Sequence, residues 1–152
     1  MSDMAEKIIE IAEKTGALLY GDFTLTSGAK SNYYFDGRII SLDPEGSYYV
    51  AKALLPILKK CGAQAVAGPS IGADPIVGAV ALLSHIEGHP LRGLMVRKEP
   101  KQHGTKKYIE GKVVPGMKVA VVDDTCTTAK SLFYAIEAVE AEGCQVVKVL
   151  AI

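Results

Sequence analysis

The sequence has no tryptophan, few cysteines and no long hydrophobic run. Its three cysteines, Cys61, Cys126 and Cys144, are odd in number and far apart, which excludes a disulfide framework and fits no zinc-ligand pattern. No apolar stretch reaches the roughly 18 residues of a membrane-spanning helix, and the polar N-terminus lacks the pattern of a signal peptide. We therefore expect a cytoplasmic protein with reduced thiols and no membrane partner.

Net charge is absent as well, since Lys and Arg together number 17 and so do Asp and Glu. A neutral chain is not drawn as a whole to nucleic acid. The composition, 49% hydrophobic and 22% charged, is that of an ordinary globular protein, and 152 residues fit one domain. Cations nevertheless gather in one stretch, with only Glu99 opposing them: Arg97, Lys98, Lys101, Lys106 and Lys107. This clustering predicts a local site for a polyanion, such as one that carries a metal ion.

Helical and strand patterns alternate from residue 43 onward. Residues 18–36 are predicted to form short strands and turns. The longer elements are expected as helices at 3–14, 44–60, 75–85 and 129–141, and as strands at 63–68, 91–96, 108–114, 118–122 and 145–152. The helix at 75–85 is apolar almost all round, so that the sheet or a second subunit must cover it on most sides.

Several of these strands are apolar throughout, which is typical of strands buried on both faces. The pattern predicts an α/β fold with a central parallel sheet flanked by helices. We expect one domain over residues 1–152, made of an N-terminal helix with strands at 1–40 and an α/β core at 43–152.

The segment from 119 to 131 carries the strongest functional pattern. A buried strand ends in two acids, Asp123 and Asp124, and hydroxyl residues then lead into a helix: Thr125, Thr127, Thr128 and Ser131. Ligands bind at this edge of an open α/β sheet, and free N–H groups at a helix N-terminus favour a phosphate. The acids accept hydrogen bonds from ribose hydroxyls or metal-bound water. A plain helix cap is the alternative, but it needs only one such residue. The pattern therefore predicts a site for a phosphorylated sugar.

This segment resembles the phosphoribosyl-diphosphate signature of the type I phosphoribosyltransferases: four apolar residues, two acids, two variable residues and Thr-Thr-Gly-x-Ser. The resemblance places Cys126 and Lys130 in the substrate-binding segment, although we expect no catalysis from Cys126. Ala129 stands at the position of the signature glycine, and Thr125 at one that is more often aliphatic. The alanine costs little in a helical backbone, and about 1–2 kcal/mol if the loop needs a left-handed residue.

Further segments resemble one family of this class, the orotate phosphoribosyltransferases. Residues 97–104, Arg-Lys-x-x-Lys-x-His-Gly, are similar to that family's catalytic loop. Three more stretches match the family in its order: 23–28 (Phe-Thr-Leu-Thr-Ser-Gly), 31–36 (Ser-Asn-Tyr-Tyr-Phe-Asp) and 68–75 (Gly-Pro-Ser-Ile-Gly-Ala-Asp-Pro). A solvated basic loop is the alternative for the first run, but its length and its Gly and Pro content also suit a lid.

The resemblance implies a type I phosphoribosyltransferase fold with a small N-terminal hood, in a homodimer whose 97–107 loops are shared across subunits. The implied reaction transfers ribose 5-phosphate from phosphoribosyl diphosphate to N1 of orotate. Its products are orotidine 5′-monophosphate and diphosphate, in pyrimidine biosynthesis. It requires Mg²⁺, bound mainly through substrate and water near Asp123 and Asp124 and not by a ligand set of the protein.

The resemblance also implies a role for each segment. Asp123 and Asp124 hold the ribose hydroxyls, and residues 125–131 bind the 5′-phosphate. Tyr34 and Phe35 contact the base, although plain core positions are the alternative for both. Lys101 and His103 are expected to act in catalysis, Lys101 above all. The residues implied at the diphosphate are Arg97, Lys98, Lys101, His103, Gly72, Ala73 and Asp74.

Some positions depart from the family. Thr26 and Gly72 stand where other members carry a lysine, and Asn32 replaces a usual proline. In the family, an arginine beyond the last strand pairs with the orotate carboxylate, in a segment that would begin where this sequence ends, at Ile152. No arginine follows Arg97, and we expect weaker orotate binding for that reason.

Two other functions stay open on the sequence. One is a phosphoribosyl-diphosphate-binding regulator with weak or no catalysis, and the other is a phosphoribosyltransferase for another base, such as uracil or a purine. Lys101 and His103 favour an enzyme over a regulator, because a binder has less need of a closing loop. The stretch at 23–36 favours orotate over another base.

Overall fold

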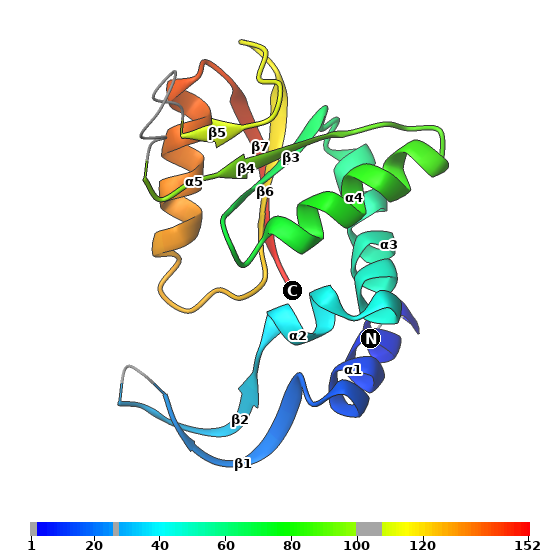
Figure 1. Ribbon diagram of the computed structural model, residues 1–152, viewed down its shortest axis with the longest axis vertical. Coiled ribbons are helices and arrows are strands. Elements are labelled where there is room, and N and C mark those ends of the chain that lie inside the picture. The colour runs from blue at the N-terminus through cyan, green and yellow to red at the C-terminus, as the bar shows by residue number, and fades with distance from the viewer. Residues whose placement is uncertain (1–2, 26–27, 100–107) are drawn as a thin grey trace.

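The computed structural model describes residues 3–25, 28–99 and 108–152 (Figure 1). Along the chain its elements are α1 (Asp3–Thr15), β1 (Leu18–Thr24), β2 (Lys30–Phe35), α2 (Gly37–Leu42), α3 (Pro44–Lys60), β3 (Ala65–Pro69), α4 (Asp74–Ile86), β4 (Arg92–Val96), β5 (Ile109–Glu110), β6 (Lys118–Asp123), α5 (Lys130–Ala141) and β7 (Gln145–Ala151). None of the helices in these ranges is long and apolar enough to cross a membrane.

The main sheet has five strands in the order β5-β4-β3-β6-β7. Its four longer strands run parallel, and only the two-residue β5 is antiparallel to its neighbour β4. The expected central parallel sheet is therefore confirmed. The carboxyl ends of β3, β4 and β6 meet at one edge, where the sequence analysis placed the ligand.

Helices cover both faces of this sheet, with α5 on one side and α3 and α4 on the other (Figure 1). Alternate residues of β3 belong to different cores: Val66 packs with the α3 and α4 side, whereas Ala65 and Ala67 pack with the α5 side. Burial on both faces explains why β3 and β6 are apolar throughout.

The last strand, β7, is less buried than β3 and β6. This strand lies at the edge of the sheet, each of its residues is exposed or only partly buried, and Val149 is 39% exposed. An apolar sequence does not reveal which strand will lack a neighbour.

Local signals place the start of α3. Asp43 accepts a hydrogen bond from the backbone N–H of Gly46 at 2.8 Å, and Pro44 occupies the first helical turn. Asp43 is thus the N-cap of α3 and Pro44 its first residue, which agrees with the helix predicted from residue 44. The short helix α2 was not predicted, since six residues give no helical periodicity. Its cap is Asp36, which accepts from the Arg38 N–H at 3.0 Å.

The apolar helix α4 is buried on one side only. Ile76, Val77 and Val80 lie in the core, whereas Leu82 and Ile86 are 65% and 69% exposed. Burial on most sides is therefore wrong for this chain by itself, because no element of its described part covers the outer side. This outer side is therefore an apolar surface that the described part of the chain leaves exposed.

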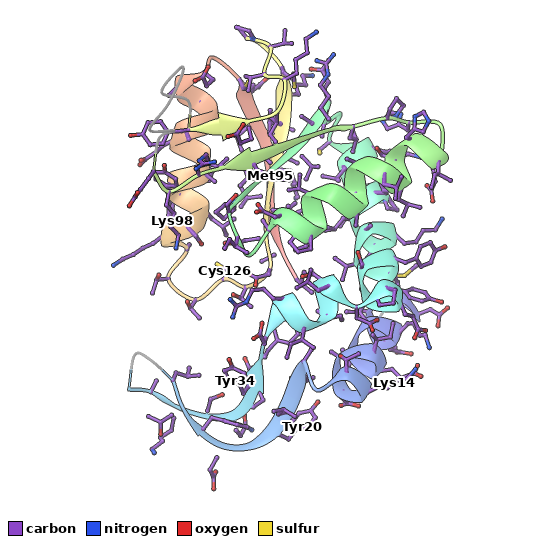
Figure 2. The ribbon with its side chains drawn as sticks, in the orientation of Figure 1. Lys14, Tyr20, Tyr34, Met95, Lys98 and Cys126 are labelled. Carbon is purple, nitrogen blue, oxygen red and sulfur yellow. The ribbon has the colours of Figure 1, made fainter. Side chains whose placement is uncertain are left out.

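The N-terminal hairpin of β1 and β2 forms a separate two-stranded antiparallel sheet. It projects away from the main sheet, below the site edge in Figure 1. Tyr20 lies on this hairpin and is exposed (Figure 2). The preceding helix α1 instead packs into the main core through Ile11 and Ala12. Of the hairpin's described residues, only Tyr34 and Phe35 at the end of β2 reach the carboxyl edge of the sheet.

Candidate active site

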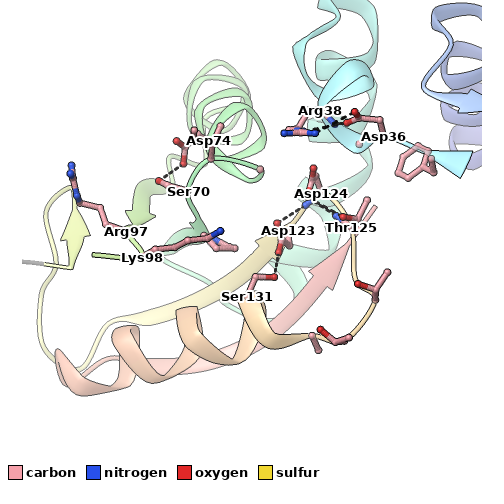
Figure 3. Close-up of a pocket in the computed structure, with 18 of the residues that line it drawn as sticks. Asp36, Arg38, Ser70, Asp74, Arg97, Lys98, Asp123, Asp124, Thr125 and Ser131 are labelled. Atoms are coloured by element: carbon pink, nitrogen blue, oxygen red, sulfur yellow. Dashed lines mark hydrogen bonds and ion pairs between the residues drawn. The ribbon is translucent and has the colours of Figure 1, made fainter. Parts of the chain in front are cut away.

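A pocket of about 930 Å³ lies at the carboxyl edge of the sheet (Figure 3). Residues from four segments line it: 34–38, 69–74, 97–99 and 123–131. The first segment joins β2 to α2, and the other three each follow a parallel strand. Parts of four of the predicted stretches, 31–36, 68–75, 97–104 and 119–131, thus come together around one cavity, whereas no described residue of the stretch at 23–28 lines it.

The first acid of the pair, Asp123, is buried at the end of β6 and only 4% exposed. One carboxylate oxygen accepts from the Ser131 hydroxyl at 2.6 Å, and the other accepts from the backbone N–H of Asp124 at 2.9 Å. Burial raises the pKa of Asp123; the two hydrogen bonds act against this, and the charge of Asp124 adds to it, so that the pKa lies above its ordinary value. The carboxyl group is thus rigidly held at the floor of the pocket.

The second acid, Asp124, is partly exposed to the pocket. Its Oδ1 atom accepts from the Thr125 backbone N–H at 2.8 Å and lies 3.4 Å from the Thr125 hydroxyl. A Cβ atom added to Gly72 would lie 2.8 Å from this same oxygen and 3.3 Å from Asp123 Oδ1. Gly72 therefore leaves open the space over both carboxylates.

Helix α5 begins without a side-chain cap. The residue at its cap, Ala129, has φ 58° and ψ 8°, which is the left-handed region, and its methyl group cannot accept a hydrogen bond. Thr127 and Thr128 are exposed and line the pocket. The plain-cap alternative is therefore not the arrangement found. The amino end of α5 faces the pocket, and the hydroxyls of Thr127 and Thr128 beside it have no hydrogen-bond partner among the described residues.

Not every residue that was expected to bind the substrate has a side chain available in the pocket. Ser131 lines the pocket, but its hydroxyl donates to Asp123. Cys126 and Lys130 are exposed without lining the pocket, with Cys126 on the loop between β6 and α5 (Figure 2). Ala73 is fully buried in the core next to the pocket.

The cationic side of the pocket follows β4. Arg97 and Lys98 line it, and the Lys98 side chain extends into it (Figure 3). The Arg97 guanidinium pairs with Glu110 at 3.3 Å. The two residues expected to act in catalysis, Lys101 and His103, lie outside the described residues.

The remaining wall comes from β2 and α2. Tyr34 is exposed and lines the pocket, whereas Phe35 both lines it and packs against the core. Arg38 was missed by sequence reasoning. Its guanidinium pairs with Asp36 at 3.3 and 3.4 Å and points into the pocket opposite Asp124 (Figure 3). The only sequence signal for Arg38 is the Asp-Gly-Arg run at 36–38, which begins at the last residue of the predicted stretch 31–36.

Gly37 was missed as well. A Cβ atom there would lie 2.8 Å from the Cβ of Asp124 and 2.9 Å from its carbonyl oxygen. Glycine is therefore what lets α2 approach the acid pair so closely.

Within the described residues, no group of three or more His, Cys, Asp or Glu side chains is arranged to hold a metal ion. The two adjacent carboxylates nevertheless offer acceptors for metal-bound water.

The carboxyl edge of the parallel sheet presents an acid pair and a hydroxyl-rich helix start after β6, and cations after β4. This arrangement defines a type I phosphoribosyltransferase. No family model matches the chain. Individual curated proteins are similar to the chain. The chain is 45% identical over 145 residues to the orotate phosphoribosyltransferase of Rhodopirellula baltica, and the match covers 91% of this chain and 75% of that protein. It is 39% identical over 149 residues to that of Aquifex aeolicus, covering 97% and 81%.

Solved structures of the same family are similar to the fold of this chain. Orotate phosphoribosyltransferase from Mycobacterium tuberculosis superposes with a TM-score of 0.82 at 34% identity, covering 99% of this chain and 83% of that one. A second structure of that enzyme, in complex with 5-phospho-α-D-ribosyl 1-diphosphate, gives a TM-score of 0.74 at 32% identity, covering 96% and 82%. The chain belongs to the orotate phosphoribosyltransferase family.

Proposed function

We propose that this chain transfers ribose 5-phosphate from phosphoribosyl diphosphate to N1 of orotate, giving orotidine 5′-monophosphate and diphosphate. One observation carries the proposal. In a single pocket of a chain from this family, Asp123 and Asp124 lie beside the uncapped start of α5, with Arg97 and Lys98 on the same cavity. An acid pair for hydroxyls, amide groups for one phosphate and cations for a second are what a phosphorylated sugar diphosphate requires.

Each part of the substrates is assigned to one of these groups of residues. Asp123 and Asp124 accept hydrogen bonds from the ribose hydroxyls, and the amino end of α5 with Thr127 and Thr128 binds the 5′-phosphate. Arg97 and Lys98 then face the diphosphate together with the 72–74 segment, while Tyr34 and Phe35 contact the flat base.

Bond cleavage at the sugar builds positive charge on the ribose and negative charge on the leaving diphosphate. Cations that are held in place before the reaction stabilise that charge where it develops. Lys98 is available for this in the pocket, and we assign the largest share to Lys101, assisted by His103. Removing such a group typically lowers the rate ~10²–10³-fold.

Mg²⁺ fits this site as a partner of the substrate. Asp123 and Asp124 would hold it through water, since no ligand set of the protein surrounds it among the described residues. When bound, Mg²⁺ supplies Lewis-acid neutralisation of the diphosphate oxygens. The carboxylates keep the hydroxyls oriented with or without the ion.

A homodimer is part of the proposal, with the 97–107 loop shared across subunits. The outer side of α4 supports it, because Leu82 and Ile86 leave large apolar surfaces exposed in this chain. Leu82→Glu should then shift the species seen in sedimentation toward the monomer, whereas Leu19→Glu on the hairpin should not.

We also place the reaction in the cytoplasm.

A competition assay separates this function from the other two. The chain is incubated with Mg²⁺, phosphoribosyl diphosphate and equal amounts of orotate, uracil, adenine and hypoxanthine, and the nucleotides formed are separated by chromatography. Orotidine 5′-monophosphate alone is expected. Formation of a different nucleotide would show that the acceptor is the base of that nucleotide and not orotate. Binding of phosphoribosyl diphosphate without formation of any nucleotide would indicate the regulator.

Binding must also depend on the acid pair. The double variant Asp123→Asn with Asp124→Asn should lose calorimetric binding of phosphoribosyl diphosphate while its circular dichroism stays unchanged. Retained binding would contradict the assignment of the sugar site.

A further inference from the structure

One side chain of α5 holds the chain where it leaves β4. Tyr134 donates its hydroxyl proton to the carbonyl oxygen of Arg97, and the same hydroxyl lies 3.2 Å from the carbonyl oxygen of Lys98. Burial, and then the neighbouring Tyr108, raises the pKa of Tyr134, so that the hydroxyl keeps its proton at neutral pH. The backbone of both pocket cations is thus fixed by a residue that does not line the pocket.

Further contacts converge on the same point. The Arg97 backbone N–H donates to the carbonyl oxygen of Tyr108 at 2.7 Å, where the chain returns toward β5. The ring of Tyr108 meets the ring of Tyr134 edge-on, with centroids 6.4 Å apart and planes at 71°. The outgoing and returning strands are therefore joined, and Tyr134 contacts both.

Tyr134 belongs to the helix that starts at the phosphate loop. It follows Ser131 by one helical turn, and Ser131 donates to Asp123 on the pocket floor. A single rigid helix thus connects the sugar end of the pocket with the backbone that carries Lys98. This connection sets the spacing between the two ends of the pocket.

We propose that Tyr134 is a positioning residue, whose hydroxyl fixes the Arg97–Lys98 backbone so that the Lys98 ammonium reaches the diphosphate of the substrate. The inference rests on the proposed function, because that function places the diphosphate at Lys98. Tyr134 itself touches no substrate and acts through Lys98.

The first test compares two phenylalanine variants and two ligands. Tyr134→Phe keeps the ring and removes the hydroxyl, while Tyr108→Phe is the matched control, because no partner of the Tyr108 hydroxyl is found among the described residues. Calorimetry is done with phosphoribosyl diphosphate and with ribose 5-phosphate, which lacks the diphosphate. Tyr134→Phe should weaken phosphoribosyl diphosphate binding roughly 3- to 10-fold, as expected for one lost hydrogen bond, and leave ribose 5-phosphate within about twofold.

The control should leave both affinities unchanged. An equal loss for both ligands in Tyr134→Phe would overturn the proposal, because it would show a general effect on α5. No loss for either ligand would overturn it too. Failure of the unaltered chain to bind phosphoribosyl diphosphate would instead refute the proposed function, and with it this inference.

A double-mutant cycle tests whether Tyr134 acts through Lys98. In a Lys98→Gln background, adding Tyr134→Phe should weaken phosphoribosyl diphosphate binding by less than about twofold, because the ammonium to be positioned is already gone. A loss as large as in the unaltered background would overturn the proposal. The unfolding midpoint of each variant is recorded as the control for folding.

Discussion

Replacing Asp123 by asparagine is predicted to stabilise the ligand-free protein while weakening its sugar binding. Asp123 is 4% exposed, and its burial raises its pKa, so that the ionised form is costly to hold at neutral pH. An asparagine removes that charge and keeps both hydrogen bonds. Its oxygen accepts from the Asp124 N–H, and its amide donates to Ser131, whose hydroxyl can turn to accept.

The size of the expected gain in stability follows from the distance between the carboxylates of Asp123 and Asp124. Asp123 Oδ1 and Asp124 Oδ1 lie no more than about 6 Å apart, since a Cβ atom on Gly72 would be 3.3 Å from the first and 2.8 Å from the second. Two charges at that distance repel by roughly 3 kcal/mol at an effective dielectric constant of about 20. Screening at the partly exposed Asp124 reduces this to about 1–2 kcal/mol, which raises the melting temperature by roughly 3–6 °C for a chain of this length.

Thermal unfolding at pH 7 measures the effect, with Asp22→Asn as the control that removes one charge from the exposed hairpin. A group with a raised folded pKa adds stability below its unfolded pKa and loses it as the pH rises through the folded value. The advantage of Asp123→Asn should therefore be full where the folded wild-type carboxyl is ionised, and should vanish as the pH falls below the ordinary aspartate pKa of about 3.9, where the carboxyl is protonated in both states. Equal or lower stability at pH 7 would refute the reasoning.

The same variant should lose sugar binding, because a neutral amide is a weaker acceptor for a ribose hydroxyl than a carboxylate. The dissociation constant for phosphoribosyl diphosphate is expected to rise about tenfold or more. An unchanged constant would remove Asp123 from the sugar site.

Other changes give equally definite outcomes. Ala129→Gly should raise the free energy of unfolding by about 0.5–1 kcal/mol in urea, because glycine relieves the left-handed strain at some cost in chain entropy; a loss would contradict the left-handed backbone. Gly37→Ala should cost about 1–3 kcal/mol of stability and weaken phosphoribosyl diphosphate binding, because its Cβ would lie 2.8 Å from the Cβ of Asp124; a neutral result would mean that α2 can shift freely. Lys101→Ala should lower kcat ~10²–10³-fold with little change in substrate affinity, and equal losses in both would contradict a role in the transition state.

The central fold was predictable because its signals are local. The apolar runs of β3 and β6, the Asp43 cap of α3 and the order of alternating elements each depend on neighbours in sequence. The phosphate loop was predictable for the same reason, since its acids and hydroxyls are consecutive. The edge position of β7 was not, because strand order is set by packing between distant segments.

The rest of the site depends on contacts across the chain. Tyr134 meets Arg97 at a separation of 37 residues, and Gly37 meets Asp124 across a still longer stretch. Neither contact leaves a periodic pattern in the sequence. Ser131 matched a known signature, yet its hydroxyl is directed to Asp123, a partner that only the folded backbone brings within reach.

The most direct test follows orotate by its ultraviolet absorbance with this chain, phosphoribosyl diphosphate and Mg²⁺, beside the double variant Asp123→Asn with Asp124→Asn. We expect the absorbance to fall with the unaltered chain, orotidine 5′-monophosphate to accumulate in equal amount, and the variant to be inactive. No loss of orotate with a folded chain that binds phosphoribosyl diphosphate would refute the transfer reaction, and full activity in the variant would refute the role of the acid pair.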